Sequence, residues 1–281
     1  MFALEKPNYK LEKVDFNVDV PFSDKIKPPF ENKSFFYIIV GKPGSGKTSV
    51  LINMLTNKKI YKKVFTKILL CMPQNSRLSL KDNIFEDLPE DQIFDALDPT
   101  ILTKIKLNKD EFEEDKLERL EDGKKPITRH QLLILDDVTA HLKNKENINM
   151  LIELVTNRRH YNLSIVLLVQ FLRSIPRPVR FFTTSCIFFK AANNLDIEIL
   201  REEYINLSKN VFEELMNFVF DGDSHDYMII NKDTNTYYKK LQKIIFSNVI
   251  NGQENNKKIQ RTKEDSQESN SKTKTKTKTE Y

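Results

Sequence analysis

The sequence has few residues that cross-link or bind metals, and it has no long apolar run. Only two cysteines, Cys71 and Cys186, occur in 281 residues, and both stand inside apolar, strand-like segments. This placement predicts reduced, buried thiols in an intracellular protein and argues against a disulfide or a metal site. The four scattered histidines likewise give no zinc-binding spacing.

Segments that target or span membranes are also lacking. No apolar run approaches the about 20 residues that a membrane-spanning helix needs. The N-terminus, MFALEKPNYK, has no basic region followed by an apolar one, as a secretory signal would. We therefore expect a protein that is neither secreted nor transmembrane.

Charge is distributed unevenly along the chain. The net charge is +5, with 39% hydrophobic and 30% charged residues, which suits a polar, soluble globular protein. Residues 78–127 contain 8 basic and 15 acidic residues, whereas residues 251–281 contain 8 basic and 5 acidic ones. A basic body with an acidic insertion is compatible with a polyanionic partner but does not identify one.

The most informative stretch is residues 35–50, where an apolar run ends at a glycine-rich turn that reads G-x-x-x-x-G-K-T. An apolar-periodic segment typical of a helix follows. Strand, turn and helix in this order are the context of a phosphate-binding P-loop, whose backbone N–H groups point at phosphate oxygens. We therefore expect a nucleoside triphosphate to bind here. The predicted nucleotide-binding residues are Gly41, Lys42, Pro43, Gly44, Ser45, Gly46, Lys47, Thr48 and Ser49.

A second chemical landmark is the run QLLILDD at residues 131–137. Apolar residues followed by acids predict a buried parallel strand that carries carboxylates at its end. Lys47 is predicted to reach the β- and γ-phosphates, while Thr48 and Asp136 are predicted to hold Mg²⁺. Asp137 occupies the position of a carboxylate that orients or deprotonates the attacking water. Two acids that merely end a strand are the alternative.

Two further segments carry candidate residues. Residues 164–170, SIVLLVQ, predict another buried strand, and it ends in Gln170. An amide beside the acidic strand could sense the γ-phosphate and position water, or it could simply leave the core. Residues 147–159 fit a helix that ends in Arg158 and Arg159, where cations also suit the helix dipole.

The other segments give the expected organisation. We expect residues 1–33 to form an N-terminal arm that packs on the domain or reaches a neighbouring subunit. A loosely ordered terminus is the alternative. Residues 34–246 form the expected ATPase domain, in which 78–127 is a charged, acidic helical insertion. Within the insertion we expect short amphipathic helices from Ile84 to Leu97. We also expect a charged helix over 109–122, with Phe112, Leu117 and Leu120 on its apolar positions.

The C-terminal third has its own pattern. Residues 185–190 predict a further strand, and two helix-like segments span 195–205 and 211–219. Residues 225–241 alternate around a polar turn and predict a β-hairpin. Residues 251–281 are rich in lysine and threonine and almost free of apolar residues, which predicts a disordered tail.

Four features taken together, GKPGSGKT, LLILDD, NRRHYNLSIVLLVQ and SCIFFK, resemble the FtsK/HerA superfamily of P-loop translocases. Within it they resemble the poxvirus-type genome-packaging ATPases of large eukaryotic DNA viruses. The resemblance covers roughly residues 34–246. It implies an α/β fold with a RecA-like (ASCE) core, a mostly parallel central sheet flanked by helices. It also implies an added strand between the P-loop strand and the acidic strand.

The resemblance also implies a function, namely ATP hydrolysis that drives double-stranded DNA, without sequence preference, into a capsid. Such a motor is a homo-oligomeric ring that acts with viral capsid proteins, in the host cytoplasm at the assembly site or in the virion. By position, Lys47, Asp137 and Gln170 look like catalytic residues. Ring ATPases complete each site with a neighbour's arginine, for which Arg158 or Arg159 is the candidate and Arg173 the reserve.

Two other functions stay open at this point. A small-molecule (nucleoside or nucleotide) kinase on a P-loop scaffold would transfer the γ-phosphate to an acceptor. A nucleotide switch would bind ATP without translocating anything. The chain has no recognisable winged helix, so any DNA contact is expected from loops such as 171–180 or from the basic body.

Overall fold

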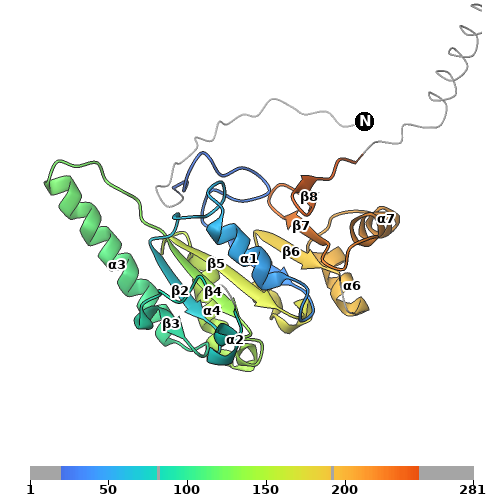
Figure 1. Cartoon of the computed structure of the whole chain (residues 1–281), viewed down its shortest axis with the longest axis horizontal. Coiled ribbons are helices and arrows are strands. Elements are labelled where there is room, and N and C mark those ends of the chain that lie inside the picture. The colour runs from blue at the N-terminus through green and yellow to red at the C-terminus, as the bar shows by residue number, and fades with distance from the viewer. Residues whose placement is uncertain (1–19, 81–82, 191–192, 247–281) are drawn as a thin grey trace, which may run out of the picture. The chain divides into compact units, whose positions relative to one another are not determined.

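The computed structural model describes residues 20–80, 83–190 and 193–246, and its elements surround one nine-stranded sheet (Figure 1). The described elements belong to the compact unit that ends at Lys243. The strands are β1 (Phe36–Val40), β2 (Lys67–Cys71), β3 (Ile93–Phe94), β4 (Gln131–Asp136), β5 (Leu163–Val169), β6 (Ser185–Phe189), β7 (Tyr227–Asn231), β8 (Thr236–Lys239) and β9 (Gln242–Lys243). The α-helices are α1 (Lys47–Thr56), α2 (Gln74–Leu78), α3 (Thr100–Glu121), α4 (Lys145–Asn157), α5 (Arg177–Phe181), α6 (Asn194–Glu203) and α7 (Lys209–Phe220).

The order of the strands is β3-β2-β4-β5-β1-β6-β7-β8-β9. The pairs from β3 through β6 are parallel, and the pairs from β6 through β9 are antiparallel. The mostly parallel α/β sheet is therefore confirmed, and β5 lies between β1 and β4 as the added strand. Because parallel strands run the same way, β1, β4 and β5 end together at what we call the carboxyl end of the sheet and begin together at its amino end.

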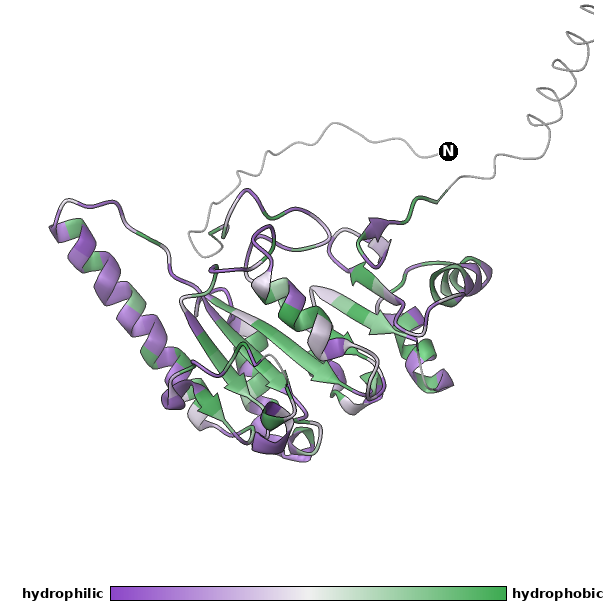
Figure 2. Ribbon diagram, in the orientation of Figure 1, coloured by the Kyte–Doolittle hydropathy of each residue, from purple (hydrophilic) through white to green (hydrophobic). Residues whose placement is uncertain are grey.

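The sheet forms because its strands are apolar on both faces. Every residue of β1, FYIIV, is buried, and β5 is buried throughout. Leu51 of α1 packs in the same cluster as Tyr37 and Ile39, and the intervening Ile38 is buried on the opposite face. Figure 1 shows α1 crossing the near face, and Figure 2 shows the strands as the most apolar part of the fold. Continuous apolar strands of this kind are typical of a parallel sheet covered by helices.

Residues 20–33, the described part of the predicted N-terminal arm, pack against the core. Ile26 and Phe30 are buried, and Phe22 makes edge-to-face contacts with Phe35 and Tyr61. These aromatic contacts attach the segment at the amino end of the sheet, next to the connection between α1 and β2. Residues 1–19 and the predicted tail at 251–281 lie outside the described residues.

The acidic insertion differs from its prediction. The short helices expected from Ile84 to Leu97 are wrong, because the described residues there form turns, a short 3₁₀-helix (Glu90–Gln92) and β3. The prolines at 89 and 99 disfavour helix in the residues that precede them. The charged helix is α3, which begins at Thr100 rather than near residue 109. Of its predicted apolar positions, Phe112 is buried, whereas Leu117 and Leu120 are 59% and 49% exposed.

The helices and the hairpin that were predicted in the C-terminal third agree with the structure. Helices α6 and α7 and the hairpin of β7 and β8 lie where the periodicity placed them. Both cysteines are buried free thiols, and burial raises the pKa of Cys71 to about 12, so this thiol stays protonated. Among the residues that the structure describes, no helix is both long enough and apolar enough to cross a membrane.

Candidate active site

The G-x-x-x-x-G-K-T turn joins β1 to α1 at the carboxyl end of the sheet. Gly44 and Gly46 have φ angles of +73° and +102°, a left-handed region that residues with a Cβ rarely enter. Lys47 folds back, and its Nζ donates hydrogen bonds to the carbonyl oxygens of Gly41 at 2.7 Å and Lys42 at 3.2 Å. Helix α1 has no side-chain cap, so its first N–H groups are left for an anion.

The base of the turn is tightly packed and tolerates only glycine. A Cβ at Gly41 would lie 2.5 Å from Ser45 Oγ and 2.8 Å from Phe189 Cβ. The Ser45 hydroxyl is buried without a hydrogen-bond partner among the described residues. A buried hydroxyl without a hydrogen bond lowers the stability of the fold unless a ligand or water molecule bonds to it. The turn therefore has a polar group ready for a bound anion or water.

The acidic strand β4 brings Asp136 to the start of α1. Its Oδ2 accepts a hydrogen bond from Thr48 Oγ1 at 3.4 Å, across 88 residues of sequence. Burial raises the pKa of Asp136, and the nearby Lys47 ammonium opposes that shift. Burial also lowers the pKa of Lys47, opposed by Asp136 and then Asp137. The attraction between the Lys47 and Asp136 charges therefore offsets part of the effect of burial on each pKa, and burial remains the larger cause.

Asp137 stands one residue beyond the strand in an unusual backbone conformation. Its φ is +56°, in the left-handed region that aspartate tolerates better than most residues. Its side chain is exposed and lines the same cavity as Lys47, Thr48 and Gln170. That cavity has a volume of about 230 Å³. Strained backbone at such a place is characteristic of sites where a side chain must be aimed at a ligand.

The arginine candidates are not part of this cavity. Arg158 and Arg159 follow α4 and precede β5, at the amino end of the sheet. One β5 length, about 20 Å, separates them from their own P-loop. Arg158 Nη1 donates to the Val155 carbonyl at 2.8 Å, whereas Arg159 is exposed and lines a different cavity with Val20.

The loop after β5 contains arginines of two kinds. Arg173 is exposed, and its guanidinium lies 5.4 Å from the ring centroid of Phe171. Arg177 is also open to solvent, with 84% of its side chain exposed. Arg180, in contrast, is buried and makes two 2.8 Å hydrogen bonds to Glu203. The expectation that DNA contacts could come from residues 171–180 therefore does not extend to Arg180, which anchors α5 to α6.

Sequence patterns missed several residues that line the site. The cavity beside Asp136 and Asp137 is also lined by Met72, Ser76 and Thr139, which belong to segments with no phosphate-binding pattern. A second cavity on the P-loop is lined by Gly44, Gly46, Lys47, Thr48, Ser49 and His225. The His225 ring lies 3.8 Å from the position of a Cβ on Gly46. His225 is the first residue of the predicted hairpin, but nothing in the sequence indicates that this hairpin reaches the P-loop.

Solved structures of two viral proteins resemble this fold. One is the genome packaging NTPase B204 from Sulfolobus turreted icosahedral virus 2 in complex with AMPPCP, with a TM-score of 0.52 and 14% identity over 76% of this chain and 99% of that one. The other is B204, the DNA-packaging ATPase from Sulfolobus turreted icosahedral virus, with a TM-score of 0.50 and 14% identity over 75% and 98%. At these identities the likeness concerns the fold alone. A search of the curated proteins gives no match.

The family comparison is more specific than the structural one. The model of the family described as Poxvirus A32 protein matches residues 26–276, which include the P-loop, the acidic strand and Gln170. This match spans most of the chain, and the RecA-like arrangement of β1, β5 and β4 agrees with it. The chain therefore belongs to the poxvirus A32 protein family.

Proposed function

We propose that this chain is an ATP-hydrolysing motor that translocates double-stranded DNA and packages a viral genome into a capsid. The observation that carries the proposal is the convergence of Thr48, Asp136 and Gln170 on one cavity, with 3.4 Å between Thr48 Oγ1 and Asp136 Oδ2. Family membership supports it, as do the names of the two B204 structures, genome packaging NTPase and DNA-packaging ATPase.

The residues of the site fit Mg²⁺ and a triphosphate. The left-handed glycines, the unpartnered Ser45 hydroxyl and the uncapped start of α1 form an anion cradle. Thr48 and Asp136 supply the hard oxygen ligands that Mg²⁺ prefers. When bound, Mg²⁺ neutralises charge on the β- and γ-phosphates. Lys47 would exchange its two carbonyl partners for phosphate oxygens and hold the γ-phosphate in place.

Asp137 and Gln170 would handle the attacking water. Asp137 is the exposed carboxylate of the cavity and would orient the water and accept its proton. Its side chain is one methylene shorter than the glutamate common in ATPases of this type. Gln170 directly follows β5, which lies between the P-loop strand and the acidic strand, and from there its amide would contact the water or the γ-phosphate.

A neighbouring subunit would complete the site with an arginine. Arg159 is exposed but lies at the amino end of the sheet, about 20 Å from its own nucleotide, so it would act only on an adjacent chain. An arginine donated in this way stabilises charge in the transition state. This dependence on a neighbour is why the proposed motor is a homo-oligomeric ring.

The second cavity on the P-loop would receive the nucleoside. The γ-phosphate must face Asp136 and Gln170, so the α-phosphate and ribose leave the turn on its other side. Ser49 and His225 line that side. The exposed His225 ring, with Nδ1 3.3 Å from Asp223 Oδ1, is placed to pack against the base or sugar. Neither residue belongs to the cavity that contains the acids.

The test is the ATPase rate with and without linear duplex DNA, with the mass in solution measured alongside. We expect oligomers whose turnover rises with duplex DNA of any sequence and falls steeply with salt. Lys47→Ala serves as the inactive control. Turnover that ignores DNA under conditions where oligomers form would contradict the proposal. Transfer of the γ-phosphate to a nucleoside would indicate a kinase, and full biological function of Lys47→Ala would indicate a switch.

A further inference from the structure

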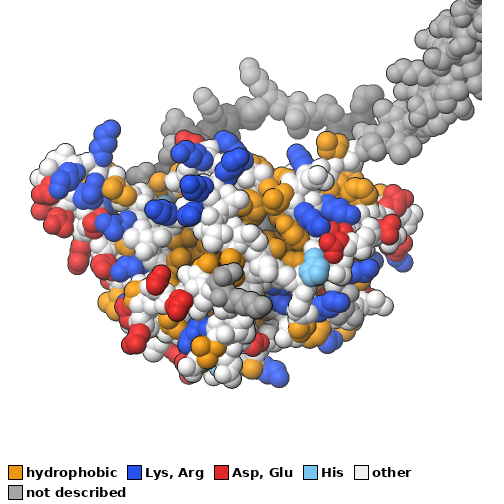
Figure 3. Space-filling view, in the orientation of Figure 1, with side chains coloured by type: hydrophobic (Ala, Val, Ile, Leu, Met, Phe, Trp, Pro, Cys, Tyr) orange, Lys and Arg blue, Asp and Glu red, His pale blue; other side chains and the backbone are white. Residues whose placement is uncertain are grey.

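Six lysines, Lys25, Lys27, Lys58, Lys59, Lys62 and Lys63, are exposed at the amino end of the sheet. We call them the lysine patch. Two come from the segment before β1 and four from the connection between α1 and β2. Figure 3 shows blue side chains gathered beyond the C-terminal end of α1. The patch therefore lies at the opposite end of the sheet from the P-loop.

Buried aromatic contacts hold the two segments of the patch together. Tyr61 is only 2% exposed, and its hydroxyl donates a hydrogen bond to the Glu31 carbonyl at 2.8 Å. The Tyr61 ring also packs edge-to-face against Phe22 and Phe30. Because Tyr61 points into the core, the lysines on either side of it are left in solvent. The patch is consequently a surface on a packed scaffold.

The lysine patch carries an excess of positive charge, because its six lysines are accompanied by one exposed acid, Asp24. None of its six lysines forms an ion pair with a described carboxylate. The acid within this surface is Glu31, and burial raises its pKa to about 8, so it adds little negative charge near neutral pH. Asp24 is the remaining acid among residues 20–33 and 57–66.

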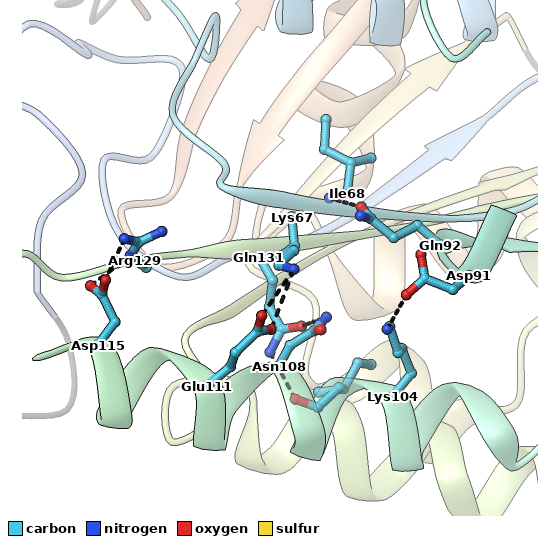
Figure 4. Close-up of polar contacts among 11 residues, drawn as sticks. Lys67, Ile68, Asp91, Gln92, Lys104, Asn108, Glu111, Asp115, Arg129 and Gln131 are labelled. Carbon is cyan, nitrogen blue, oxygen red and sulfur yellow. Dashed lines mark hydrogen bonds and ion pairs between the residues drawn. The ribbon is translucent and has the colours of Figure 1, made fainter. Parts of the chain in front are cut away.

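Lysines around neighbouring α3 behave differently (Figure 4). Lys67 pairs with Glu111 at 3.3 Å, and Lys104 pairs with Asp91. Lys106 and Lys109 also have carboxylate partners, Glu153 and Glu113. These four lysines are thus paired with carboxylates, whereas the lysines of the patch keep their charge available for a partner outside the chain.

We propose that the lysine patch binds the phosphate backbone of duplex DNA. Clustered, unpaired ammonium groups release the counterions that surround a duplex, which favours binding without reading sequence. The aromatic rings beneath the patch are buried and offer no surface for unstacked bases, which argues against single strands. Its distance from the P-loop lets it hold DNA without competing with the triphosphate. The inference rests on the proposed function only in taking DNA as the polymer.

The test compares two variants that remove the same charge. The patch variant carries Lys58→Gln, Lys59→Gln, Lys62→Gln and Lys63→Gln, and the control carries Lys124→Gln, Lys125→Gln, Lys209→Gln and Lys243→Gln. All eight lysines are exposed, so both chains are expected to fold, which circular dichroism and Tm check. Binding to a fluorescent 30-base-pair duplex is measured between about 50 and 200 mM salt without nucleotide.

We expect the patch variant to lose most of its affinity and the slope of log Kd against log salt to fall by about 3 to 4. The control variant should change both quantities far less. DNA-independent ATPase activity should stay unchanged in the patch variant while stimulation by DNA is lost. Equal losses in the two variants, or an unchanged slope, would overturn the inference.

Two further results separate this inference from the proposed function. If the ATPase rate of the wild-type protein does not change with DNA, the proposed motor function is contradicted. The binding measurement still shows whether the lysine patch binds duplex DNA. A patch variant that binds duplex DNA normally but no longer binds vesicles of phosphatidylglycerol would assign the patch to an anionic membrane surface and overturn the DNA assignment.

Discussion

The two ends of the central sheet treat charge in opposite ways. At the carboxyl end, Lys47 and Asp136 are partly buried, and the charge of each offsets part of the effect of burial on the pKa of the other. At the amino end, six lysines face solvent near the buried carboxyl of Glu31, and none of them pairs with a carboxylate in the part of the chain that the structure describes. Opposite charges brought together in a cavity suit the binding of a small, highly charged ligand. Like charges spread over a surface suit a long polyanion. One sheet thus offers two different kinds of anion site.

The largest expected effect connects the two ends through a neighbouring subunit. Arg159→Ala should lower kcat by about 10³-fold or more, because a trans arginine contributes that much in related phosphoryl-transfer systems. Mixed with wild-type subunits, it should reduce total ATPase activity below the average of the two proteins. Steady-state ATPase assays over a range of mixing ratios make the measurement.

Arg158→Ala is the matched control for that experiment. Arg158 donates to the Val155 carbonyl at the end of α4, so its loss should lower Tm. Its mixtures with wild type should be additive. If Arg158→Ala, but not Arg159→Ala, lowers the activity of mixtures below the average of the two proteins, Arg158 is the arginine that acts on the neighbouring subunit. If mixtures of either variant with wild type have the average activity of the two proteins, neither arginine acts on a neighbouring subunit.

A second large effect is expected at the carboxyl end alone. Asp137→Asn should lower kcat by about 10²- to 10⁴-fold, the usual contribution of a general base. Asparagine also tolerates the left-handed conformation with φ of +56°, so ATP binding should be retained. Single-turnover ATPase and Kd for ATP make the measurement, with exposed Asp95→Asn as control. Normal hydrolysis by Asp137→Asn would show that another group handles the water.

A smaller effect is expected from Glu31 at the amino end. Its carboxyl is buried, receives hydrogen bonds from Ser185 and Asn231, and feels Asp233 and Arg158 nearby. Desolvation raises its pKa from 4.5 to about 8, so the folded chain keeps a proton that the unfolded chain releases between these values. Stability should therefore fall as pH rises through this window, by up to about 1.4 kcal/mol per pH unit from this group.

Glu31→Gln should remove that part of the pH dependence. Urea unfolding at pH 5.5, 6.5 and 7.5 measures it, with exposed Asp24→Asn on the same segment as control. The variant should gain stability relative to wild type as pH rises. If the free energy of unfolding depends on pH equally in both proteins, Glu31 ionises normally. A negative charge would then lie beneath the lysine patch at neutral pH.

The smallest expected effect concerns the nucleoside side of the P-loop. His225→Ala should raise KM for ATP about fivefold with little change in kcat, since packing of one ring is worth about 1 kcal/mol. Inhibition by tripolyphosphate, which has no nucleoside, should be unchanged. His225→Phe should restore much of the affinity. Equal losses for ATP and tripolyphosphate would show that His225 acts on the phosphates instead.

The same comparison explains what the sequence could predict. The P-loop at the carboxyl end is one contiguous sequence motif, because binding phosphate requires glycine, lysine and threonine at fixed spacing. The acids of β4 and the amide of β5 each follow an apolar run, and parallel strands bring such ends together. Lys47, Thr48, Asp136, Asp137 and Gln170 were therefore recognisable, and the structure places all five around one cavity.

No sequence motif marks the lysine patch at the amino end or the position of His225 beside the P-loop. The lysine patch joins residues 25–27 to residues 58–63 through the burial of Tyr61, which no local pattern specifies. The contact of His225 with Gly46 depends on where the hairpin packs. Around residues 84–97, apolar spacing suggested helices, but prolines at both sides and pairing of β3 with β2 gave turns and an edge strand.

The most direct measurement is a crystal structure of the chain with AMPPCP and Mn²⁺, using the anomalous signal to locate the metal. The account predicts the triphosphate in the Gly41–Thr48 turn, with the metal peak next to the Thr48 hydroxyl on the side that faces Asp136. Asp137 and Gln170 should border the γ-phosphate. A metal peak away from Asp136, or a triphosphate outside the turn, would contradict the account.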